Sequence, residues 1–522
     1  MKQTIHFFLN GNLKEIQVKA ETTVLELLRN NLELKGIKEG CGEGDCGACT
    51  VVIGEVREGS VHYKSVTGCL YLAAKLEGKH LITIEGLAEK GKLHPIQEAI
   101  LSAHATQCGF CTPGVSLSIL ALYLERSNPT KEEFRRYLEG NLCRCTGYEA
   151  IRKVPEYLKE LSICAGDIRP GYLQAVEEKQ LSYLQEDIFI DDGKNAYYSP
   201  VSEENLLEFL RDQKELTAGG NFKYINGGSD IVVGIKKRNQ HNRLLIDLSR
   251  MDSLQFIAQA SSQKDKEASQ INPLQANEAP QVNLLQANVL SQANSLQAKE
   301  LILGGGVSLS RVIDSTKDIF PEFSDTVQRM CSEQVRSSAT VAGNIVNASP
   351  VADTVPLLMA VDATLTLQAQ TGERKVTIRS FFHGYKQTEN RAEEWIKAIT
   401  IPLGEYNFIH FEKVSKRKEV DISAVNSAIA LKIEKGRITK ADVACGGVGP
   451  TTLYLPKTSR YLEGKEMKEE TFLGAFEVIA AEATPIGDVR GSAEYRRAVM
   501  QNLILKHYLA FQSRQEVDGD EA

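Results

Sequence analysis

Three cysteines close together near the N-terminus, with a fourth further along, are the residues whose spacing most clearly predicts chemistry. The segment from Lys38 to Thr50 reads KEGCGEGDCGACT, with four residues between its first two cysteines and two between the next. Thiolates at this spacing, completed by a fourth, are typical of a 2Fe-2S cluster. The predicted ligands are Cys41, Cys46, Cys49 and Cys69.

Four glycines lie within the same segment, at Gly40, Gly42, Gly44 and Gly47. A loop that wraps a small anionic cluster must bring backbone N–H groups close to sulfur, and it needs backbone angles that a Cβ atom makes costly. A structural zinc site is the alternative, but zinc loops usually present cysteines in two close pairs, and the sequence has no second such pair nearby. A disulfide framework is less favoured, because eleven cysteines in 522 residues is far below the density of a disulfide scaffold.

Four more cysteines follow in a region whose apolar residues have helical spacing from Gln97 onward, in the motifs CGFCTPG and NLCRCTGY. Helices are predicted over Val115–Leu124, after the first motif, and over Glu132–Leu138, before the second. The predicted ligands of this second cluster are Cys108, Cys111, Cys143 and Cys145. Two centres held entirely by thiolates leave no open position for substrate, so the pair predicts an electron relay.

The elements that must position the first cluster are predicted by short-range patterns. An Asn-Gly between two apolar runs predicts a hairpin, and Thr23 followed by Glu26 has the spacing of a capping box at the start of a helix. The predicted strands are Thr4–Leu9, Leu13–Val18, Thr50–Ile53 and Leu81–Ile84. From the hairpin to Cys69, the chain resembles a plant-type ferredoxin domain, with a mixed sheet crossed by one main helix.

Composition excludes several classes of protein. With 42% hydrophobic residues, 25% charged residues and a formal net charge of -7, the chain is typical of globular proteins and not of nucleic-acid-binding or disordered ones. No apolar run approaches the roughly 20 residues that cross a bilayer. Reduced cysteines predict a cytoplasmic location.

Glycine-rich turns mark a third region. The segment Tyr224–Gly234, YINGGSDIVVG, places glycines at a predicted turn from strand to helix, where free N–H groups can meet a phosphate. It is not a GxGxxG motif, and taken alone it favours a structural role. Two more loops, LGGGVSL from Leu303 and ATVAGNIVNASP from Ala339, shift the balance toward a ligand.

Between Gln255 and Lys299 the composition narrows to Gln, Asn, Ala, Ser and Leu, with LQAN and related words at irregular spacing. A solenoid needs a fixed period, so we predict a disordered surface insertion, with a short amphipathic helix as the alternative.

In this order, the motifs resemble those of the molybdenum hydroxylases. The eight cysteines resemble the iron–sulfur module of that family, and the glycine loops resemble its FAD-binding domain, which has the fold of vanillyl-alcohol oxidase. The motifs VACGGVG and DVRGSAEYRR resemble its C-terminal flavoprotein subdomain. The resemblance implies a multidomain α+β fold: a ferredoxin-type β-grasp domain at 1–85, a four-helix 2Fe-2S domain at 86–165, a linker at 166–190, an FAD domain at 191–402 with the insertion at about 256–299, and an α+β subdomain at 403–515.

The same resemblance implies residue roles. The pyrophosphate of FAD would be bound by Asn226, Gly227, Gly228, Ser229, Asp230 and Ile231; its pyrophosphate and ribitol would be bound by Thr340, Gly343, Asn344 and Asp353. Lys413 would lie near the flavin ring. Met330 stands where relatives often place an aromatic ring beside the flavin. Gln107 and Cys145 would lie nearest the pterin of a partner.

The implied function is that of the small subunit of a xanthine dehydrogenase, with no substrate-oxidising residue on this chain. A molybdopterin-binding large subunit would hydroxylate a purine, and electrons would pass through the helical-domain cluster, the ferredoxin-type cluster and FAD to NAD. Three alternatives stay open: an electron-transfer subunit for an aldehyde or N-heterocycle dehydrogenase, a self-sufficient NADH:acceptor reductase, and a non-catalytic protein with two zinc sites.

Overall fold

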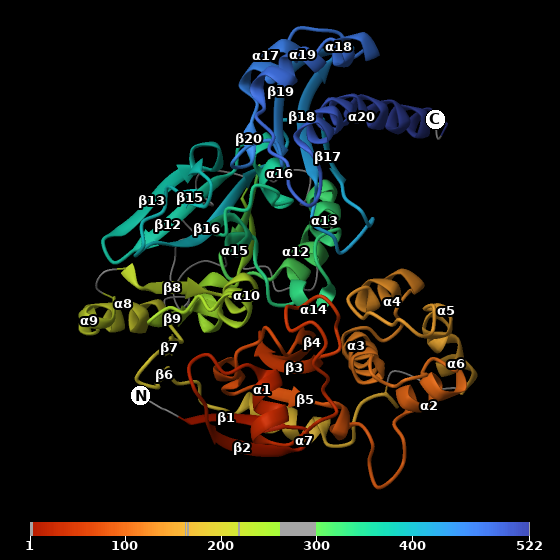
Figure 1. The fold of residues 1–522 in the computed structure, drawn as a ribbon, viewed down its shortest axis with the longest axis vertical. Helices are drawn as coiled ribbons and strands as arrows, with labels where there is room; N and C mark the ends of the chain where they lie inside the picture. The colour runs from red at the N-terminus through yellow and green to blue at the C-terminus, as the bar shows by residue number, and fades with distance from the viewer. Residues whose placement is uncertain (1–3, 162, 164–165, 218–219, 261–298, 521–522) are drawn as a thin grey trace, which may run out of the picture. The chain divides into compact units, whose positions relative to one another are not determined.

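In the computed structural model, residues 4–161, 163, 166–217, 220–260 and 299–520 are described. They divide into two compact units (Figure 1). Unit 1 contains Met1–Asp252 together with Cys331–Ala339, and unit 2 contains Ser253–Met330 together with Thr340–Ala522. The two units are described separately below.

Unit 1 begins with a five-stranded mixed sheet, in the order β2-β1-β5-β3-β4. Its strands are β1 (Thr4–Leu9), β2 (Asn12–Gln17), β3 (Thr50–Arg57), β4 (Ser60–Thr67) and β5 (His80–Ile82). The predicted hairpin is confirmed, with β1 and β2 antiparallel and Leu9 opposite Asn12. The capping box is also confirmed: Thr23 accepts from the Glu26 N–H and Glu26 from the Thr23 N–H, at the start of α1 (Val24–Glu26), which continues as a π-helical turn, Leu27–Asn31.

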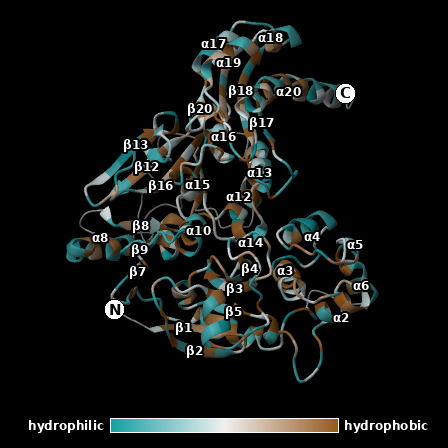
Figure 2. Ribbon diagram, viewed as in Figure 1, coloured by the Kyte–Doolittle hydropathy of each residue, from teal (hydrophilic) through white to brown (hydrophobic). Residues whose placement is uncertain are grey.

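A helical part follows, made of α2 (Pro95–Ser102), α3 (Thr112–Glu125), α4 (Lys131–Leu138), α5 (Glu149–Arg152) and α6 (Val154–Glu160). Both predicted helices are present, as α3 and α4. Helix α3 is buried from Gly114 to Leu122, whereas α4 buries one face and is largely teal, hydrophilic, in Figure 2. The central position of α3 explains its almost uninterrupted apolar sequence.

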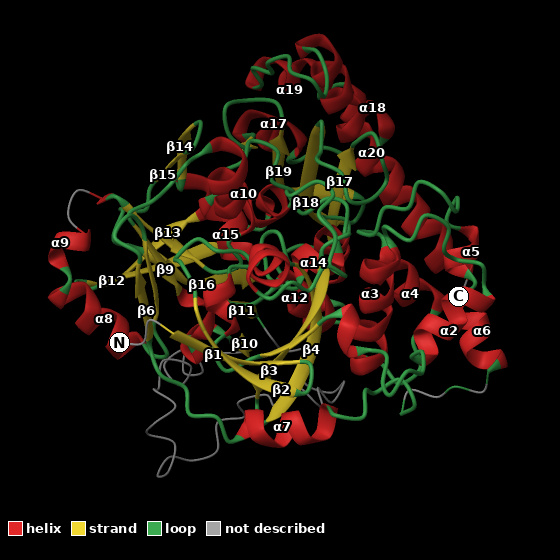
Figure 3. Ribbon diagram, turned by 60° about the horizontal axis from the view of Figure 1, so that its bottom comes forward, coloured by secondary structure: helices red, strands yellow, loops and turns green. Residues whose placement is uncertain are grey.

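The stretch 166–190, expected to be a polar linker, is more structured than its composition suggests. It contains α7 (Leu173–Leu181), which runs beside the first sheet (Figure 3). Leu173, Val176 and Gln180 are buried, and the Gln180 side chain donates to the carbonyls of Gly54 and Gly78 at 2.8 and 3.2 Å. Because the helix buries only a narrow stripe, its sequence has the polarity of a linker.

The rest of unit 1 is a four-stranded sheet in the order β6-β7-β9-β8 with three helices. These elements are β6 (Ile188–Asp191), β7 (Ala196–Ser199), α8 (Glu203–Asp212), α9 (Lys214–Thr217), β8 (Phe222–Ile225), α10 (Ser229–Arg238) and β9 (Leu244–Asp247). A short helix, α14 (Glu333–Arg336), returns to this unit from later in the chain.

Unit 2 contains a five-stranded antiparallel sheet in the order β10-β11-β16-β12-β13. Its strands are β10 (Ile257–Ala260), β11 (Glu300–Gly304), β12 (Thr364–Ala369), β13 (Gly372–Thr377) and β16 (Trp395–Pro402), with a separate small hairpin of β14 (Phe382–Gly384) and β15 (Gln387–Thr388). Its helices are α12 (Leu309–Thr316), α13 (Pro321–Gln328), α15 (Val341–Val346) and α16 (Thr354–Ala360).

A second antiparallel sheet, β17-β18-β19-β20, forms the end of unit 2. Its strands are β17 (Phe408–Val414), β18 (Val425–Glu434), β19 (Arg437–Gly446) and β20 (Leu453–Tyr454), packed with α17 (Pro456–Leu462), α18 (Glu469–Leu473), α19 (Phe476–Glu482) and α20 (Ala493–Asp520). The multidomain α+β fold is thereby confirmed. No helix among the described residues is both long and apolar enough to cross a bilayer.

The low-complexity segment joins two paired strands. Strand β10 occupies the beginning of the predicted insertion at 256–299, and residues 261–298 lie outside the described part of the chain. On either side, Ala260 pairs with Glu300, and the Lys299 N–H donates to the Ala260 carbonyl at 2.8 Å. The two ends of the segment therefore meet across one ladder.

We expect that replacing residues 261–298 by Asn-Gly will change the free energy of unfolding by only about 1 kcal/mol, because loop-closure entropy grows logarithmically with length. The replacement leaves a three-residue connection, a length that hairpins accept. Chemical denaturation and the flavin absorbance per chain measure the effect, with a scrambled segment of equal length as the control. Loss of FAD from the shortened chain alone would show that the segment belongs to the flavin site.

Candidate cluster and flavin sites

The first four cysteines lie together in unit 1 as two pairs. The Cys41 N–H donates to the Cys46 sulfur at 3.4 Å, and the two side chains are hydrogen-bonded. Cys49 and Cys69 form the other pair and are 2% and 3% exposed. No three His, Cys, Asp or Glu side chains of the described residues converge to hold a single metal ion. Two pairs of thiols fit a two-iron cluster, in which each iron takes two protein ligands.

Within each pair of this loop, the hydrogen bond favours the thiolate form of one of the two cysteines. The Cys46 thiol lowers the pKa of Cys41, helped by the N–H groups of Glu43 and Asp45, which donate to its sulfur at 3.4 and 3.3 Å. The Cys69 thiol likewise lowers the pKa of Cys49. The same hydrogen bonds, together with burial, raise the pKa of Cys46 and Cys69, so each pair favours one thiolate and one thiol. A bound cluster, which needs four thiolates, would displace the two remaining protons.

The predicted need for glycine in this loop is confirmed most clearly at Gly47. Its φ is +65°, and a Cβ atom there would lie 2.4 Å from the Gly140 carbonyl oxygen and 2.7 Å from the Asn141 amide. Any side chain would push apart the two cluster-binding loops. The sequence predicted that the backbone angle requires glycine here. It did not predict that the contact with Gly140 and Asn141 requires glycine as well.

The second set of cysteines is also arranged in pairs, but at the surface. Cys111 is hydrogen-bonded to Cys143, and Cys108 to Cys145. Cys143 is buried and lies 3.1 Å from the Thr146 hydroxyl, whereas Cys108 and Cys145 are exposed. Burial disfavours the Cys143 thiolate, but the bonds from Thr146 lower its pKa overall.

An exposed apolar edge surrounds this second site. Phe110 and Leu142 are each 46% exposed and Tyr148 is 37% exposed. Gln107, predicted to face the pterin of a partner, is exposed beside Cys108. Large apolar side chains beside a redox site favour an interaction surface.

The two cluster-binding loops touch each other. The Leu142 N–H donates to the Cys46 carbonyl at 3.0 Å, and the Asn141 amide donates to the Gly47 carbonyl at 3.2 Å. Sequence analysis did not single out Asn141. Its place at the start of the NLCRCTGY motif was the available signal, since an isolated Asn is usually a turn or surface residue.

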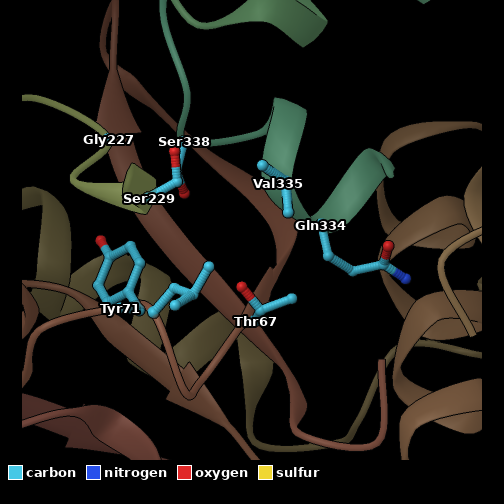
Figure 4. A pocket seen from close by; sticks show the side chains of 8 residues that line it. Thr67, Tyr71, Gly227, Ser229, Gln334, Val335 and Ser338 are labelled. Carbon is cyan, nitrogen blue, oxygen red and sulfur yellow. The ribbon is translucent and has the colours of Figure 1, made fainter. Parts of the chain in front are cut away.

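The predicted phosphate loop has the expected local geometry. Strand β8 ends at Ile225, Gly228 adopts φ +71° as the N-cap, and α10 begins at Ser229. The first N–H groups of a helix have no partner within it, so this turn suits an anion. Figure 4 shows Gly227 and Ser229 lining one pocket with Thr67 and Tyr71 from the ferredoxin-type part.

A buried lysine that sequence analysis missed supports this loop. Lys75, 4% exposed, donates to the Asn226 carbonyl at 2.6 Å and to Asp247 at 2.7 Å. Burial lowers the pKa of Lys75, while Asp247 opposes that shift. Lysine is usually a surface residue, so the sequence did not indicate that Lys75 is buried and supports the turn at Asn226.

Unit 2 holds the other predicted flavin residues. Lys413 donates to Asp353 at 2.8 Å, and both are buried. Asn426 donates to the same carboxylate at 2.7 Å. Thr340 caps α15 by accepting from the Gly343 N–H at 2.9 Å.

Two further predicted positions have neighbouring contacts in this unit. The Thr354 hydroxyl donates to the Asn344 side chain at 2.7 Å. Met330 is 8% exposed and its N–H donates to the Val327 carbonyl. Asn344 and Met330 thus each make a hydrogen bond within the protein. Their roles toward FAD stay predictions.

A basic cavity of about 510 Å³ lies next to the buried Lys413. It is lined by Arg329, Lys413, Arg417, Lys418 and Lys506, by the carboxylate Glu412, and by Val414 and Ser415. Glu412 pairs with Arg329 at 2.9 Å and with Lys506 at 3.1 Å. Asp353 and Asp421, which do not line the cavity, pair with Lys413 at 2.8 Å and with Arg417 at 3.8 Å. The remaining excess of positive charge suits an anionic ligand, and the volume lies within the roughly 300–1,000 Å³ typical of ligand pockets.

Comparison with protein families matches four domain models along the chain. They are a 2Fe-2S iron-sulfur cluster binding domain at residues 7–74, a [2Fe-2S] binding domain at 83–155, an FAD binding domain in molybdopterin dehydrogenase at 275–404, and a CO dehydrogenase flavoprotein C-terminal domain at 410–511. The chain therefore contains two 2Fe-2S-binding domains and an FAD-binding domain.

Individual relatives agree with these matches. The chain is 30% identical to xanthine dehydrogenase/oxidase of Rattus norvegicus over 96% of its own length and 38% of that protein. It is 27% identical to aldehyde oxidase 1 of Rattus norvegicus, over 96% of this chain and 39% of that protein. The chain thus spans about two-fifths of the length of these relatives. A solved chain of carbon monoxide dehydrogenase from Hydrogenophaga pseudoflava aligns with a TM-score of 0.49 and 21% identity, covering 59% of this chain and 94% of that one.

We expect Cys46→Ser to disturb the EPR signal of one cluster and to spare the other, because Cys46 pairs with Cys41 and not with a cysteine of the second set. Cys445→Ser is the matched control: Cys445 is buried, lies 3.3 Å from the Ser427 hydroxyl, and belongs to neither set. Loss of both signals from a Cys46→Ser protein that stays folded and flavinated would contradict this partition.

Proposed function

This chain belongs to the molybdenum hydroxylase family, and we propose that it is the electron-transfer part of a xanthine dehydrogenase-type enzyme. The observation that carries the proposal is the direct contact between two four-cysteine sites in a chain that also has an FAD-binding domain. A relay needs its centres close together, and here their loops share a hydrogen bond. The clusters and the flavin, when bound, supply the one- and two-electron chemistry.

We propose that the eight cysteines are the cluster ligands: Cys41, Cys46, Cys49 and Cys69 for the ferredoxin-type cluster, and Cys108, Cys111, Cys143 and Cys145 for the helical-domain cluster. The chain contributes thiolates, N–H donors to sulfur and burial. Cys49 and Cys69 of the first set are buried, whereas Cys108 and Cys145 of the second set are exposed, so the two clusters would have different surroundings. Burial and hydrogen bonds to sulfur are factors that set cluster potentials.

For FAD, we propose that the turn from Asn226 to Ile231 binds the pyrophosphate and that Lys75 fixes this turn through the Asn226 carbonyl. Thr340, Gly343, Asn344 and Asp353 are proposed to bind pyrophosphate and ribitol. Lys413 is proposed to lie near the flavin ring. Its ammonium group is held by Asp353 at 2.8 Å and by the Asp421 carbonyl at 2.9 Å, so its charge is fixed in place.

We propose that the exposed edge around the second cluster binds a molybdopterin-containing partner. Phe110, Leu142 and Tyr148 supply apolar surface beside the exposed Cys145, and Gln107 supplies a hydrogen-bonding amide. A partner seated there would cover the cluster from water and bring its own redox centre close to it. Oxidation of the substrate would take place on that partner.

We propose NAD as the electron acceptor, bound in the basic cavity beside Lys413. A dinucleotide carries a diphosphate, and the cations of this cavity have the charge that would attract it. The rim residues Arg417 and Lys418 are exposed and accessible to such a ligand.

The substrate class depends on the partner. A purine is favoured by the 30% identity to a xanthine dehydrogenase/oxidase, while an aldehyde is the second candidate because an aldehyde oxidase matches over the same share of this chain. An N-heterocycle dehydrogenase is a further variant of the same arrangement. A self-sufficient NADH:acceptor reductase would need no partner at all.

We expect the purified chain to transfer electrons from NADH to a dye but not to oxidise xanthine until a molybdopterin-binding large subunit is added. The flavin and cluster domains suffice for the first reaction, whereas the substrate site is proposed to lie on the partner. Steady-state assays with xanthine, and in parallel with an aldehyde, measure the second reaction. Purine turnover by the chain alone would overturn the two-part arrangement.

Gln107→Ala in the reconstituted enzyme should slow xanthine turnover and leave NADH:dye activity unchanged, because only the partner side of the relay is altered. Glu98→Ala, an exposed change in the preceding helix α2, is the control. Equal rates in both variants would remove the proposed role of Gln107 at the interface.

Charge reversal at the basic cavity tests the acceptor. Lys418→Glu should raise the KM for NADH roughly tenfold, equivalent to about 1.4 kcal/mol of lost charge attraction, while FAD content and activity at saturating NADH stay the same. Lys432→Glu, on β18 in the same subdomain but outside the cavity, should leave the KM unchanged. An unchanged KM in Lys418→Glu would move the acceptor site elsewhere.

A further inference from the structure

A single hydrogen bond connects the backbones of the two cluster-binding loops. The Leu142 N–H donates to the Cys46 carbonyl at 3.0 Å, and Leu142 directly precedes Cys143. Cys46 and Cys143 belong to opposite ligand sets. Apart from this hydrogen bond, the route between the two cysteines is covalent.

Asn141, the residue before Leu142, is held by four polar neighbours. The Asn141 side chain is 4% exposed. Its amide lies 3.2 Å from the Gly47 carbonyl and 3.5 Å from the Thr50 hydroxyl. Its carbonyl accepts from Ser118 at 2.8 Å and from Gln334 at 2.9 Å. Asn141 therefore ties the second loop to the first and depends on two donors for its own orientation.

Gln334 reaches this group from a distant part of the sequence. It is 1% exposed, and its amide nitrogen lies 2.9 Å from the Ser118 hydroxyl and 3.3 Å from the Tyr137 carbonyl. Figure 4 shows its side chain extending from α14 on the side away from Ser229 and Ser338. Arg336, fully buried on the same helix, pairs with Glu139 and anchors α14 against the residues just before Asn141.

We infer that Gln334 is a positioning residue for electron transfer between the clusters: it orients Asn141, and Asn141 keeps the Leu142 N–H on the Cys46 carbonyl. The inference rests on the proposed function, since it requires that both cysteine sets bind clusters. The step moves one electron from the reduced helical-domain cluster to the oxidised ferredoxin-type cluster. No bond forms or breaks, and no proton moves at the cysteines.

The physical reason is the cost of an unpaired polar group in a buried site. Without the Gln334 amide, the Asn141 carbonyl and the Ser118 hydroxyl lose a donor where water cannot replace it. The network then rearranges as a unit, because its members polarise and orient each other. A lengthened contact between Leu142 and Cys46 weakens the only hydrogen bond in the route described above.

The test compares two buried glutamines given the same substitution. Gln334→Met removes the amide donor at nearly constant volume. Gln180→Met does the same on α7, where Gln180 is also 1% exposed and donates to Gly54 and Gly78 away from the cluster loops. Full-length proteins are compared by iron and FAD content, by hydrogen exchange of the peptide containing Leu142, by magnetic coupling between the reduced clusters, and by the rate of electron redistribution after partial reduction with dithionite.

We expect Gln334→Met to keep its iron and FAD, to exchange the Leu142 amide several-fold faster, to weaken the magnetic coupling, and to slow redistribution several-fold. Gln180→Met should match the wild type in all four measurements. If the two variants behave alike, the inference is overturned.

Ser118→Ala gives a second, milder test, because it removes the other donor to Asn141 and leaves Gln334 in place. If Gln334→Met fails to retain clusters, faster Leu142 exchange and slower redistribution in Ser118→Ala support the inference, and unchanged values overturn it. A wild-type protein that lacks either EPR signal overturns the proposed function itself. Two normal signals with no effect of either variant overturn only the positioning role.

Discussion

The close approach of two backbone loops at Gly47 is the constraint on which the iron–sulfur half depends. A Cβ atom at this position would lie 2.4 Å from the Gly140 carbonyl oxygen, so the contact requires a residue without a side chain. The same contact places Asn141 over the first cluster loop and Leu142 beside Cys46. The two loops are packed so closely that they cannot move apart without breaking the hydrogen bonds between them.

Local sequence signals predicted the elements around this contact well. The Asn10-Gly11 hairpin, the Thr23 capping box and the two cysteine motifs each involve residues within a few positions of one another, where backbone chemistry decides the structure. The spacing of the eight cysteines therefore predicts two sets of four from the sequence alone. The sequence did not indicate that the two loops would share hydrogen bonds.

Polar residues that become buried account for the main differences. Helix α14 has the sequence EQVR, and a pattern based on hydrophobicity assigns such residues to the surface, yet Gln334 is 1% exposed and Arg336 is fully buried. Lys75 and α7 were missed for the same reason. Each is stabilised by specific partners far away in the chain, such as Asp247 for Lys75, and a single sequence does not reveal those pairings.

The return of residues 331–339 to unit 1 has a consequence for the order of synthesis. Gln334 bonds to Ser118, 216 positions earlier, and Arg336 to Glu139, 197 positions earlier. The ribosome must therefore deliver the first part of unit 2 before the packing of unit 1 is complete. Such long-range closure is slow compared with local folding. Until α14 has been synthesised, Asn141 lacks the donor that Gln334 supplies, so the hydrogen-bond network between the two cysteine loops is completed only after residue 334 has been translated.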